Sequence, residues 1–292
     1  MSHNNISISL FEDIINNNGP DIHQYSQINS YINSLTNEDE ITNLKDKITF
    51  ILKAKNTVFG HAFEKPFGYA GDYLLIEKLY QKYVSKDNSF TKWDEFFHSH
   101  CATEAVRNRK TFFINKMDSI NKNPKVQLRV LILGSGPATD VYEYLNISKA
   151  SNVIFDLLDI DQRAIEYAAA KNKIFKNNLN FIKSNVLRFK TQKTYDMVWS
   201  AGLFDYLNDR QFSYLIKRFY ENLKDEGQMI IGNFSDKNPT KKVMEIMTEW
   251  YLNHRSHQHL TQLAINAGIN DFNCIVEEEP LGINLFLKLV KL

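Results

Sequence analysis

A glycine turn at residues 134–136 is the part of this sequence best suited to bringing its backbone against a ligand. The apolar run 130–133 ends at Gly134-Ser135-Gly136, and a helical pattern begins directly after it. Glycine has no side chain in the way, so a strand that passes through such a turn into a helix can approach a ligand closely. An ordinary strand-to-helix turn of an α/β protein remains an open alternative on these residues alone.

An acid follows the next apolar run, and its position suggests ribose binding. The run 153–158 ends in Asp159-Ile160-Asp161 and leads into a second helical pattern. In nucleotide-binding βαβ units, an acid at the tip of the second strand binds the ribose hydroxyls, and Asp159 has that place. Asp161 is interpreted as the N-cap of the helix that follows.

Two features of the turn disfavour a dinucleotide. No third glycine follows Gly136, although the dinucleotide fingerprint uses one for close helix–strand packing. Asp140 would also place a negative charge near a diphosphate. Both features are compatible with a cofactor that has no phosphate and carries cationic groups, such as S-adenosylmethionine.

Residues 125–292 resemble the class I S-adenosylmethionine-dependent methyltransferases, whose motifs follow here in order. The glycine turn corresponds to the loop beside the methionine part of the cofactor, and Asn185 corresponds to the polar residue that faces the adenine amine. The resemblance implies a cofactor site made of Gly134, Ser135, Gly136, Asp159, Ile160, Asn185, Val186, Ser200 and Ala201.

The fold implied by this resemblance is α/β and Rossmann-like. It is a doubly wound, mostly parallel sheet of about seven strands with a C-terminal antiparallel hairpin, and an N-terminal helical domain precedes it. The fourth strand is expected at 195–199, and the hairpin at 272–276 and 283–290. A turn into the fifth strand is expected at Asp225-Glu226-Gly227, which replaces the family's commoner Pro-Gly-Gly.

Four separated segments resemble a bacterial subgroup that includes 3-hydroxypalmitate methyl ester synthases and peptide carboxyl methyltransferases. They are residues 67–73, 200–207, 231–234 and 250–255. The resemblance implies that the methyl acceptor is a carboxylate on a hydrophobic acid or a peptide C-terminus.

A carboxylate acceptor needs a cation rather than a base. With a pKa of roughly 4 it is already ionised at neutral pH, and arginine is the side chain that best holds one of its oxygens. Arg255 is the first candidate, and Arg107 and Arg109 come second. Surface ion pairing is the alternative role for all three.

Tyr69 and Tyr206 are the other catalytic candidates. Tyr69 lies in the glycine-rich loop 65–72, which is expected either to close as a water-excluding lid or simply to connect two helices. Tyr206 follows the fourth strand and is expected to contact the acceptor or to pack. Asp205 and His254 are the remaining candidates for substrate binding.

The sequence pattern of the N-terminal half predicts helices. Apolar residues at helical spacing occur in 10–15 and 41–53, and further helices are predicted at 72–84, 91–100 and 103–119, with Asp72 as an N-cap. A polar, proline-bearing joint at 121–125 predicts a boundary near 124. The domains expected are therefore 1–124, a helical cap or lid, and 125–292, the cofactor-binding domain.

Composition excludes several classes of partner. The 292 residues carry a net charge of +1, which disfavours nucleic acid. Cys101 and Cys274 are far apart, and residues 1–9 lack a signal core, so we expect a cytoplasmic protein. No apolar run approaches the roughly 20 residues of a membrane span, so no membrane insertion is expected. His254, His257 and His259 lack the spacing of a metal site, so no metal is expected.

Two other functions remain open. The first is N- or hydroxyl O-methylation of a natural product, with Asp205 or His254 as base. The second is a cofactor-binding regulatory protein without catalysis, which Asn185 and the missing Pro-Gly-Gly allow. The sequence does not indicate an oligomeric state.

Overall fold

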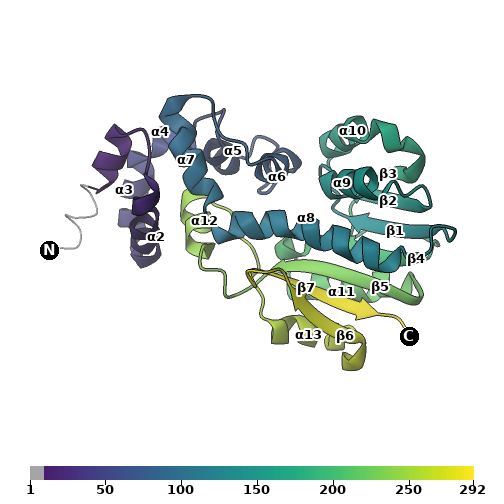
Figure 1. The fold of residues 1–292 in the computed structure, drawn as a ribbon. Helices are drawn as coiled ribbons and strands as arrows, with labels where there is room; N and C mark the ends of the chain where they lie inside the picture. Colours follow the sequence, from purple (N-terminus) through teal and green to yellow (C-terminus); the bar gives the residue numbers. More distant parts are fainter. Residues whose placement is uncertain (1–9) are drawn as a thin grey trace. The chain divides into compact units, whose positions relative to one another are not determined.

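The computed structural model describes residues 10–292, which form two compact units (Figure 1). The first unit contains residues up to Glu104 together with 239–251, and the second contains 105–238 and 252–292. The expectation for residues 1–9 lies outside the described part of the chain.

The second unit is built on one seven-stranded sheet, as predicted. Its order is β3-β2-β1-β4-β5-β7-β6; β1 to β5 are parallel, and β7 runs antiparallel to both β5 and β6. The strands are β1 (Leu128–Leu133), β2 (Val153–Asp159), β3 (Leu179–Lys183), β4 (Tyr195–Ser200), β5 (Leu223–Phe234), β6 (Cys274–Glu278) and β7 (Asn284–Val290).

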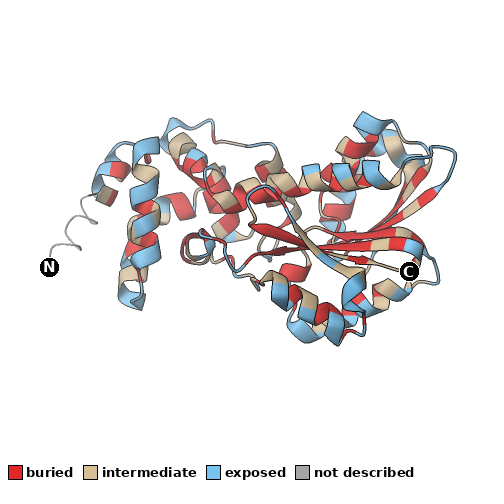
Figure 2. Ribbon diagram, turned by 60° about the horizontal axis from the view of Figure 1, so that its bottom comes forward, coloured by how far each residue is buried: buried red, intermediate tan, exposed pale blue. Residues whose placement is uncertain are grey.

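Helices cover both faces of this sheet, and alternation along β1 explains why. Val130 and Ile132 face a core shared with α8 (Cys101–Ile120) and α9 (Thr139–Ser148), whereas Leu131 and Leu133 face a core shared with α11 (Asp209–Glu221) and α13 (His257–Asn266). Each fully buried aliphatic side chain contributes about 1.5–3 kcal/mol. The strands are accordingly buried between the two helical layers (Figure 2). The remaining helices of this unit are α10 (Gln162–Lys171), α11 (Asp209–Glu221) and α13 (His257–Asn266), with the short turns η2 (Lys173–Asn178), η3 (Phe204–Tyr206) and η4 (Asp271–Asn273).

The first unit is helical, and most of its predicted helices are present. Residues 10–16 are helical, Asp72 caps α6 by accepting the N–H groups of Leu74 and Leu75, and the helix predicted at 41–53 is divided at Ile48. Of the helices described in this unit, α2, α5 and α12 were not predicted. Its elements are η1 (Ile22–Gln24), α2 (Tyr25–Ser34), α3 (Glu38–Lys47), α4 (Thr49–Leu52), α5 (Val58–Glu64), α6 (Tyr73–Tyr80), α7 (Asn88–His98) and α12 (Lys241–Thr248).

The compact units divide at residue 104 rather than at the boundary expected near 124. From residue 105 onward α8 belongs with the sheet, because Phe113 and Met117 are buried in its core. Residues 239–251 belong to the first unit because α12 packs against α2 and α5.

The turn expected before the fifth strand is instead a bulge inside β5. The pairing with β4 passes from Tyr195–Leu223 to Met197–Gln228, so β5 holds extra residues at this point. Glu226 adopts a φ of 62°, and a Cβ on Gly227 would lie 2.8 Å from the carbonyl oxygen of Lys224. The glycine is therefore required by close backbone approach.

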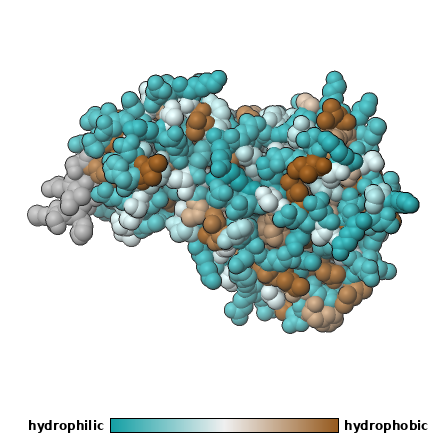
Figure 3. Space-filling model, in the orientation of Figure 1, coloured by the Kyte–Doolittle hydropathy of each residue, from teal (hydrophilic) through white to brown (hydrophobic). Residues whose placement is uncertain are grey.

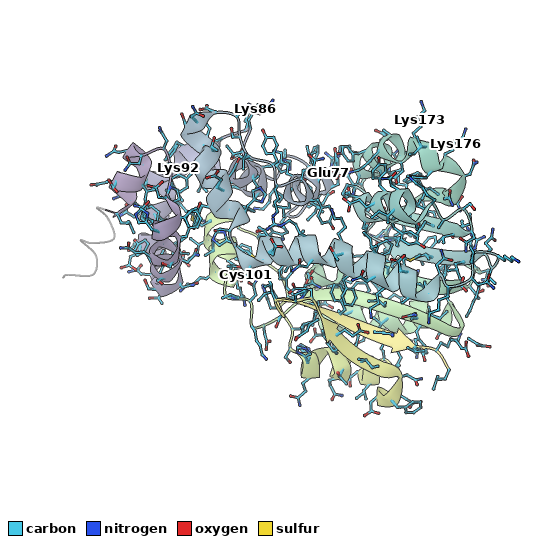
Figure 4. All side chains as sticks on the ribbon, viewed as in Figure 1. Glu77, Lys86, Lys92, Cys101, Lys173 and Lys176 are labelled. Carbon is cyan, nitrogen blue, oxygen red and sulfur yellow. The ribbon has the colours of Figure 1, made fainter. Side chains whose placement is uncertain are left out.

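The surface in Figure 3 is mostly hydrophilic, with apolar residues in small separate groups. Lys173 and Lys176 on η2 are exposed and extend away from the ribbon (Figure 4). Within residues 10–292, each helix is too short or too polar to span a membrane.

Candidate functional site

The ends of four parallel strands bring the predicted cofactor residues to one edge of the sheet. The glycine turn follows β1, Asp159 ends β2, Asn185 follows β3, and Ser200 ends β4. Hydrogen bonds join these segments: the Ser200 hydroxyl donates to the Leu133 carbonyl at 2.9 Å, and Ser184 N–H donates to the Asp159 carbonyl at 2.9 Å. In open α/β sheets this edge is where ligands bind.

The glycine turn combines one crowded position with one open position. Gly134 and Gly136 have φ values of 67° and 51°, in the left-handed region that favours glycine. A Cβ on Gly134 would lie 3.1 Å from Cβ of Leu203, whereas a Cβ on Gly136 would meet nothing within 4 Å. The space beside Gly136 is therefore open to a ligand.

The Ser135 side chain supplies a polar group without a partner. It is 7% exposed, and its hydroxyl makes no hydrogen bond to the described residues. An unsatisfied buried polar group costs about 1–3 kcal/mol, so a ligand that bonds to it recovers this cost. This hydroxyl is the feature of the turn that best fits a polar cofactor.

Asp159 is held in place by backbone groups. Its Oδ2 accepts Gly136 N–H at 2.8 Å and its Oδ1 accepts Asp161 N–H at 2.9 Å, which leaves lone pairs on both oxygens for hydroxyl groups. Burial raises the pKa of this carboxyl group. The next residue, Ile160, is 62% exposed and offers an apolar surface. Asp161 caps α10, as predicted, by accepting Arg163 N–H.

The segment after β3 is ordered by Asn185. Its side-chain oxygen accepts Leu187 N–H at 2.9 Å, and Val186 beside it is buried. The adenine contact expected of Asn185 stays a prediction.

Asp140 lies in the first turn of α9, directly after the glycine turn. It is 8% exposed, and burial raises the pKa of its carboxyl group to about 6, with Arg109 acting in the opposite direction. A buried acid here would favour a cationic ligand over a phosphate.

Arg255, the first candidate for binding the acceptor, has no donor left for it. It is 2% exposed, and every N–H of its guanidinium is taken by a protein oxygen. The acceptors are the carbonyls of Phe204 (3.2 Å) and Leu207 (2.6 Å), Asn233 Oδ1 (2.7 Å), and Asp209 Oδ1 at 3.1 Å from Nε and 3.0 Å from Nη2. We therefore correct its role to positioning the segment that follows β4.

Arg109, unlike Arg255, has a donor that none of the described residues accepts. It is 4% exposed, its Nη1 donates to the Ala201 carbonyl at 3.1 Å, and its buried Nε has no partner among the described residues. Its guanidinium carbon lies 5.9 Å from the centre of the Phe234 ring. Arg109, which came second among the sequence candidates for binding the acceptor, is thus the buried cation beside the end of β4.

Asp205 and His254 both make structural contacts. Asp205 is 1% exposed, and its Oδ1 accepts Phe234 N–H at 2.7 Å. Burial raises its pKa to about 6, while Arg109 and Arg255 act to lower it. His254 is half-buried, with Nε2 3.2 Å from the Asn238 amide nitrogen.

The remaining acceptor candidates stay predictions. Tyr206 is 41% exposed at the end of η3, and Arg107 is half-buried on α8. Tyr69, 38% exposed, belongs to the first unit, on the loop between α5 and α6.

Asn233 and His61 are buried polar residues that were not singled out from the sequence. Asn233 is fully buried and links Arg255 to the Asn253 carbonyl. In the first unit, His61 Nε2 lies 2.9 Å from both oxygens of Asp72 and so supports the cap that ends the Tyr69 loop. A polar residue in an apolar run is a signal for such positions, but their partners are far away in sequence.

Among the described residues, no group of three or more His, Cys, Asp or Glu side chains could hold a metal ion. His257 pairs with Glu278 at 3.2 Å and His259 with Asp209 at 2.9 Å.

Comparison with known sequences identifies a methyltransferase domain. A family model described as "Methyltransferase domain" matches residues 130–227. Malonyl-[acyl-carrier protein] O-methyltransferase 1 of Ilyobacter polytropus is 28% identical over 124 residues, which are 42% of this chain and 44% of that protein. The chain spans less than half of the length of the curated relatives it matches.

Solved structures share the fold. A possible exported protein from Bordetella parapertussis aligns with a TM-score of 0.62 at 16% identity, over 75% of this chain and 79% of that one. Magnesium protoporphyrin IX methyltransferase from Synechocystis PCC 6803, solved with bound SAH, aligns with a TM-score of 0.50 at 11% identity, over 65% and 87%. With this strand order and a methyltransferase domain matched over residues 130–227, the second unit is a class I S-adenosylmethionine-dependent methyltransferase domain.

Proposed function

We propose that this protein transfers a methyl group from S-adenosylmethionine to a carboxylate, on a hydrophobic acid or a peptide C-terminus, to give a methyl ester. The observation that carries the cofactor part is the buried Ser135 hydroxyl, which has no partner beside the open position at Gly136. Asp159 accepts a hydrogen bond from the Gly136 N–H of the same turn.

The residues at this edge have distinct roles in the proposed site. Ser135 and Gly136 hold the methionine part of the cofactor, and Asp159 accepts hydrogen bonds from its ribose hydroxyls. Ile160, Asn185 and Val186 surround the adenine, while Asp140 contributes the negative charge that suits a cation. When bound, S-adenosylmethionine supplies a methyl group on a cationic sulfonium. Methyl transfer then depends on how well the protein aligns the acceptor and excludes water.

Two lines support a carboxylate as acceptor. The curated relatives are named as malonyl-[acyl-carrier protein] O-methyltransferases, and four segments resemble carboxyl methyltransferases. Tyr206, Arg107 and His254 are the remaining candidates of the second unit to line the acceptor site, and the role of Tyr69 in the first unit stays a prediction.

A hydroxyl or amine acceptor is the second candidate. The pKa of Asp205, raised to about 6, suits a general base. Against this role, its Oδ1 is occupied by the Phe234 N–H and its side chain is buried.

The acceptor class is tested by the fate of the methyl group. The protein is incubated with methyl-labelled S-adenosylmethionine and a panel of fatty acids, a malonyl thioester, peptides with free C-termini, amines and alcohols. A carboxyl enzyme yields label that mild base releases as methanol. Base-stable label on an amine or hydroxyl would contradict the carboxylate assignment but leave the methyltransferase assignment intact.

Ser135→Ala is expected to weaken S-adenosylmethionine binding without destabilising the cofactor-free protein. The hydroxyl has no partner to lose in the free protein, whereas the complex loses about 0.5–1.5 kcal/mol, or roughly two- to thirteenfold in affinity. Calorimetry and urea unfolding measure the two effects. Ser200→Ala, which breaks a bond to Leu133, is the control that should lower stability. A Ser135→Ala protein that binds with wild-type affinity would contradict this role.

Asp159→Asn is expected to reduce affinity for S-adenosylmethionine and S-adenosylhomocysteine alike, because both carry the ribose. Loss of a charge-assisted hydrogen bond of about 1.5–3 kcal/mol predicts roughly a 10- to 100-fold weaker complex. Asp196→Asn removes an acid near the opposite end of β4 and should leave both affinities unchanged. Equal affinities for Asp159→Asn and Asp196→Asn would refute the ribose assignment.

Affinity for S-adenosylmethionine is expected to rise as pH increases through about 6 and then to level off. The pKa of Asp140 is raised to about 6, so only above this pH does Asp140 present the charge that attracts a cation. If binding lowers this pKa by about one unit, affinity rises about tenfold. S-adenosylhomocysteine, which lacks the sulfonium charge, should show a smaller rise. The same pH profile in Asp140→Asn would rule out this explanation.

A further inference from the structure

We propose that the Arg109 guanidinium binds the carboxylate of the methyl acceptor. This inference rests on the proposed function and deepens it, because it assigns the cation that a carboxylate acceptor requires. It also moves that role away from Arg255, whose N–H donors are all in use.

The first argument is the unused hydrogen-bonding capacity of a buried cation. One nitrogen of Arg109, Nη1, donates to the Ala201 carbonyl, and Nε is buried without a partner in the described part of the chain. A buried guanidinium is costly unless its donors and its charge are satisfied. Nε and Nη2 form the side-on edge that matches the two oxygens of a carboxylate.

The second argument is position. Ala201 and Gly202 directly follow β4, and Phe234 is the last residue of β5. Leu203 lies against the Gly134 position of the glycine turn. A short chain of contacts therefore joins the cation to the turn that is proposed to hold the methionine part of the cofactor.

The third argument is that the sequence leaves room for this guanidinium. A Cβ on Gly202 would lie 2.7 Å from Nη1 of Arg109, so this glycine is needed for the observed placement. The neighbouring aromatic ring of Phe234 supports the cation without using its donors.

The fourth argument concerns charge. Asp140 and Asp205 both interact electrostatically with Arg109, yet each is held by a backbone N–H, from Val141 and Phe234 respectively. Their charges stabilise a buried cation, while the Nε edge remains without an acceptor. A carboxylate ligand would supply the hydrogen-bond acceptor that this edge lacks.

The experiment compares Arg109→Gln and Arg109→Lys with the wild type and with Lys116→Gln. Lys116 lies on the same helix and pairs with Glu277, so its replacement removes one positive charge away from Arg109. The probes are octanoate, hexadecanoate, a malonyl thioester and a synthetic peptide with a free C-terminus. The readouts are KM and kcat for the carboxylates that the wild type methylates, and calorimetric affinity for S-adenosylmethionine.

Arg109→Gln is expected to raise the acceptor KM by at least about tenfold while cofactor affinity stays within about twofold. Arg109→Lys should recover part of the loss, because it keeps the charge but not the fork. Lys116→Gln should match the wild type. A wild-type KM in Arg109→Gln, or an equal loss of cofactor affinity, would overturn the assignment.

Gly202→Ala is the second variant, and it tests the proposal even if Arg109→Gln does not fold. Its added Cβ displaces Nη1 while the guanidinium charge remains, so the acceptor KM should rise in the same direction. An unchanged KM would count against the proposal. Wild-type protein that methylates no carboxylate but does methylate an amine or alcohol would remove the carboxylate function itself. Ester formation that is insensitive to Arg109 would remove only this inference.

Discussion

The buried guanidinium of Arg255 is the interaction on which the candidate site depends. Through its N–H groups it joins η3, which follows β4, and the end of β5 to the first residue of α11. Burying a charge is costly unless its donors are satisfied, and in Arg255, which is 2% exposed, each one is. These hydrogen bonds hold the segment from Ala201 to Asn208 in place. The other groups of this segment can therefore be positioned precisely.

Arg109 and Arg255 are two buried arginines of the second unit whose hydrogen-bond donors are used very differently. Both are nearly inaccessible, and both lie near Asp205 and Phe234. Arg255 is saturated by protein oxygens, whereas Arg109 has one protein hydrogen bond and a bare Nε. In the segment that follows β4, the carbonyls of Phe204 and Leu207 accept from Arg255, whereas only that of Ala201 accepts from Arg109. A guanidinium whose donors are all used suits a structural role, and one with an unused donor suits the proposed binding of a ligand.

Much of the second unit was predictable, because continuous apolar runs followed by acids or glycines are typical of parallel strands. The same pattern predicted the candidate site at β1 and β2, and Asp161 and Asp72 were correctly identified as caps. Helix α2 was missed because its Asn- and Ser-rich sequence is stabilised by burial of Ile28 and Ile32 rather than by propensity. Helix α5 is short and contains Gly60. The roles of the two arginines could not be ranked, since donor saturation depends on residues up to 92 positions apart.

The path of the chain through the two compact units has a consequence for how the protein is made. Residues 239–251 complete the first unit, yet the ribosome delivers them only after β1 to β5. Until then the surfaces of α2 and α5 that receive α12 have no cover, including the places of buried Val243 and Met247. The helical unit thus cannot be finished before most of the sheet exists. An N-terminal fragment that ends at residue 124 would carry an uncovered apolar face, whereas excision of residues 239–251 would damage the first unit while sparing every strand.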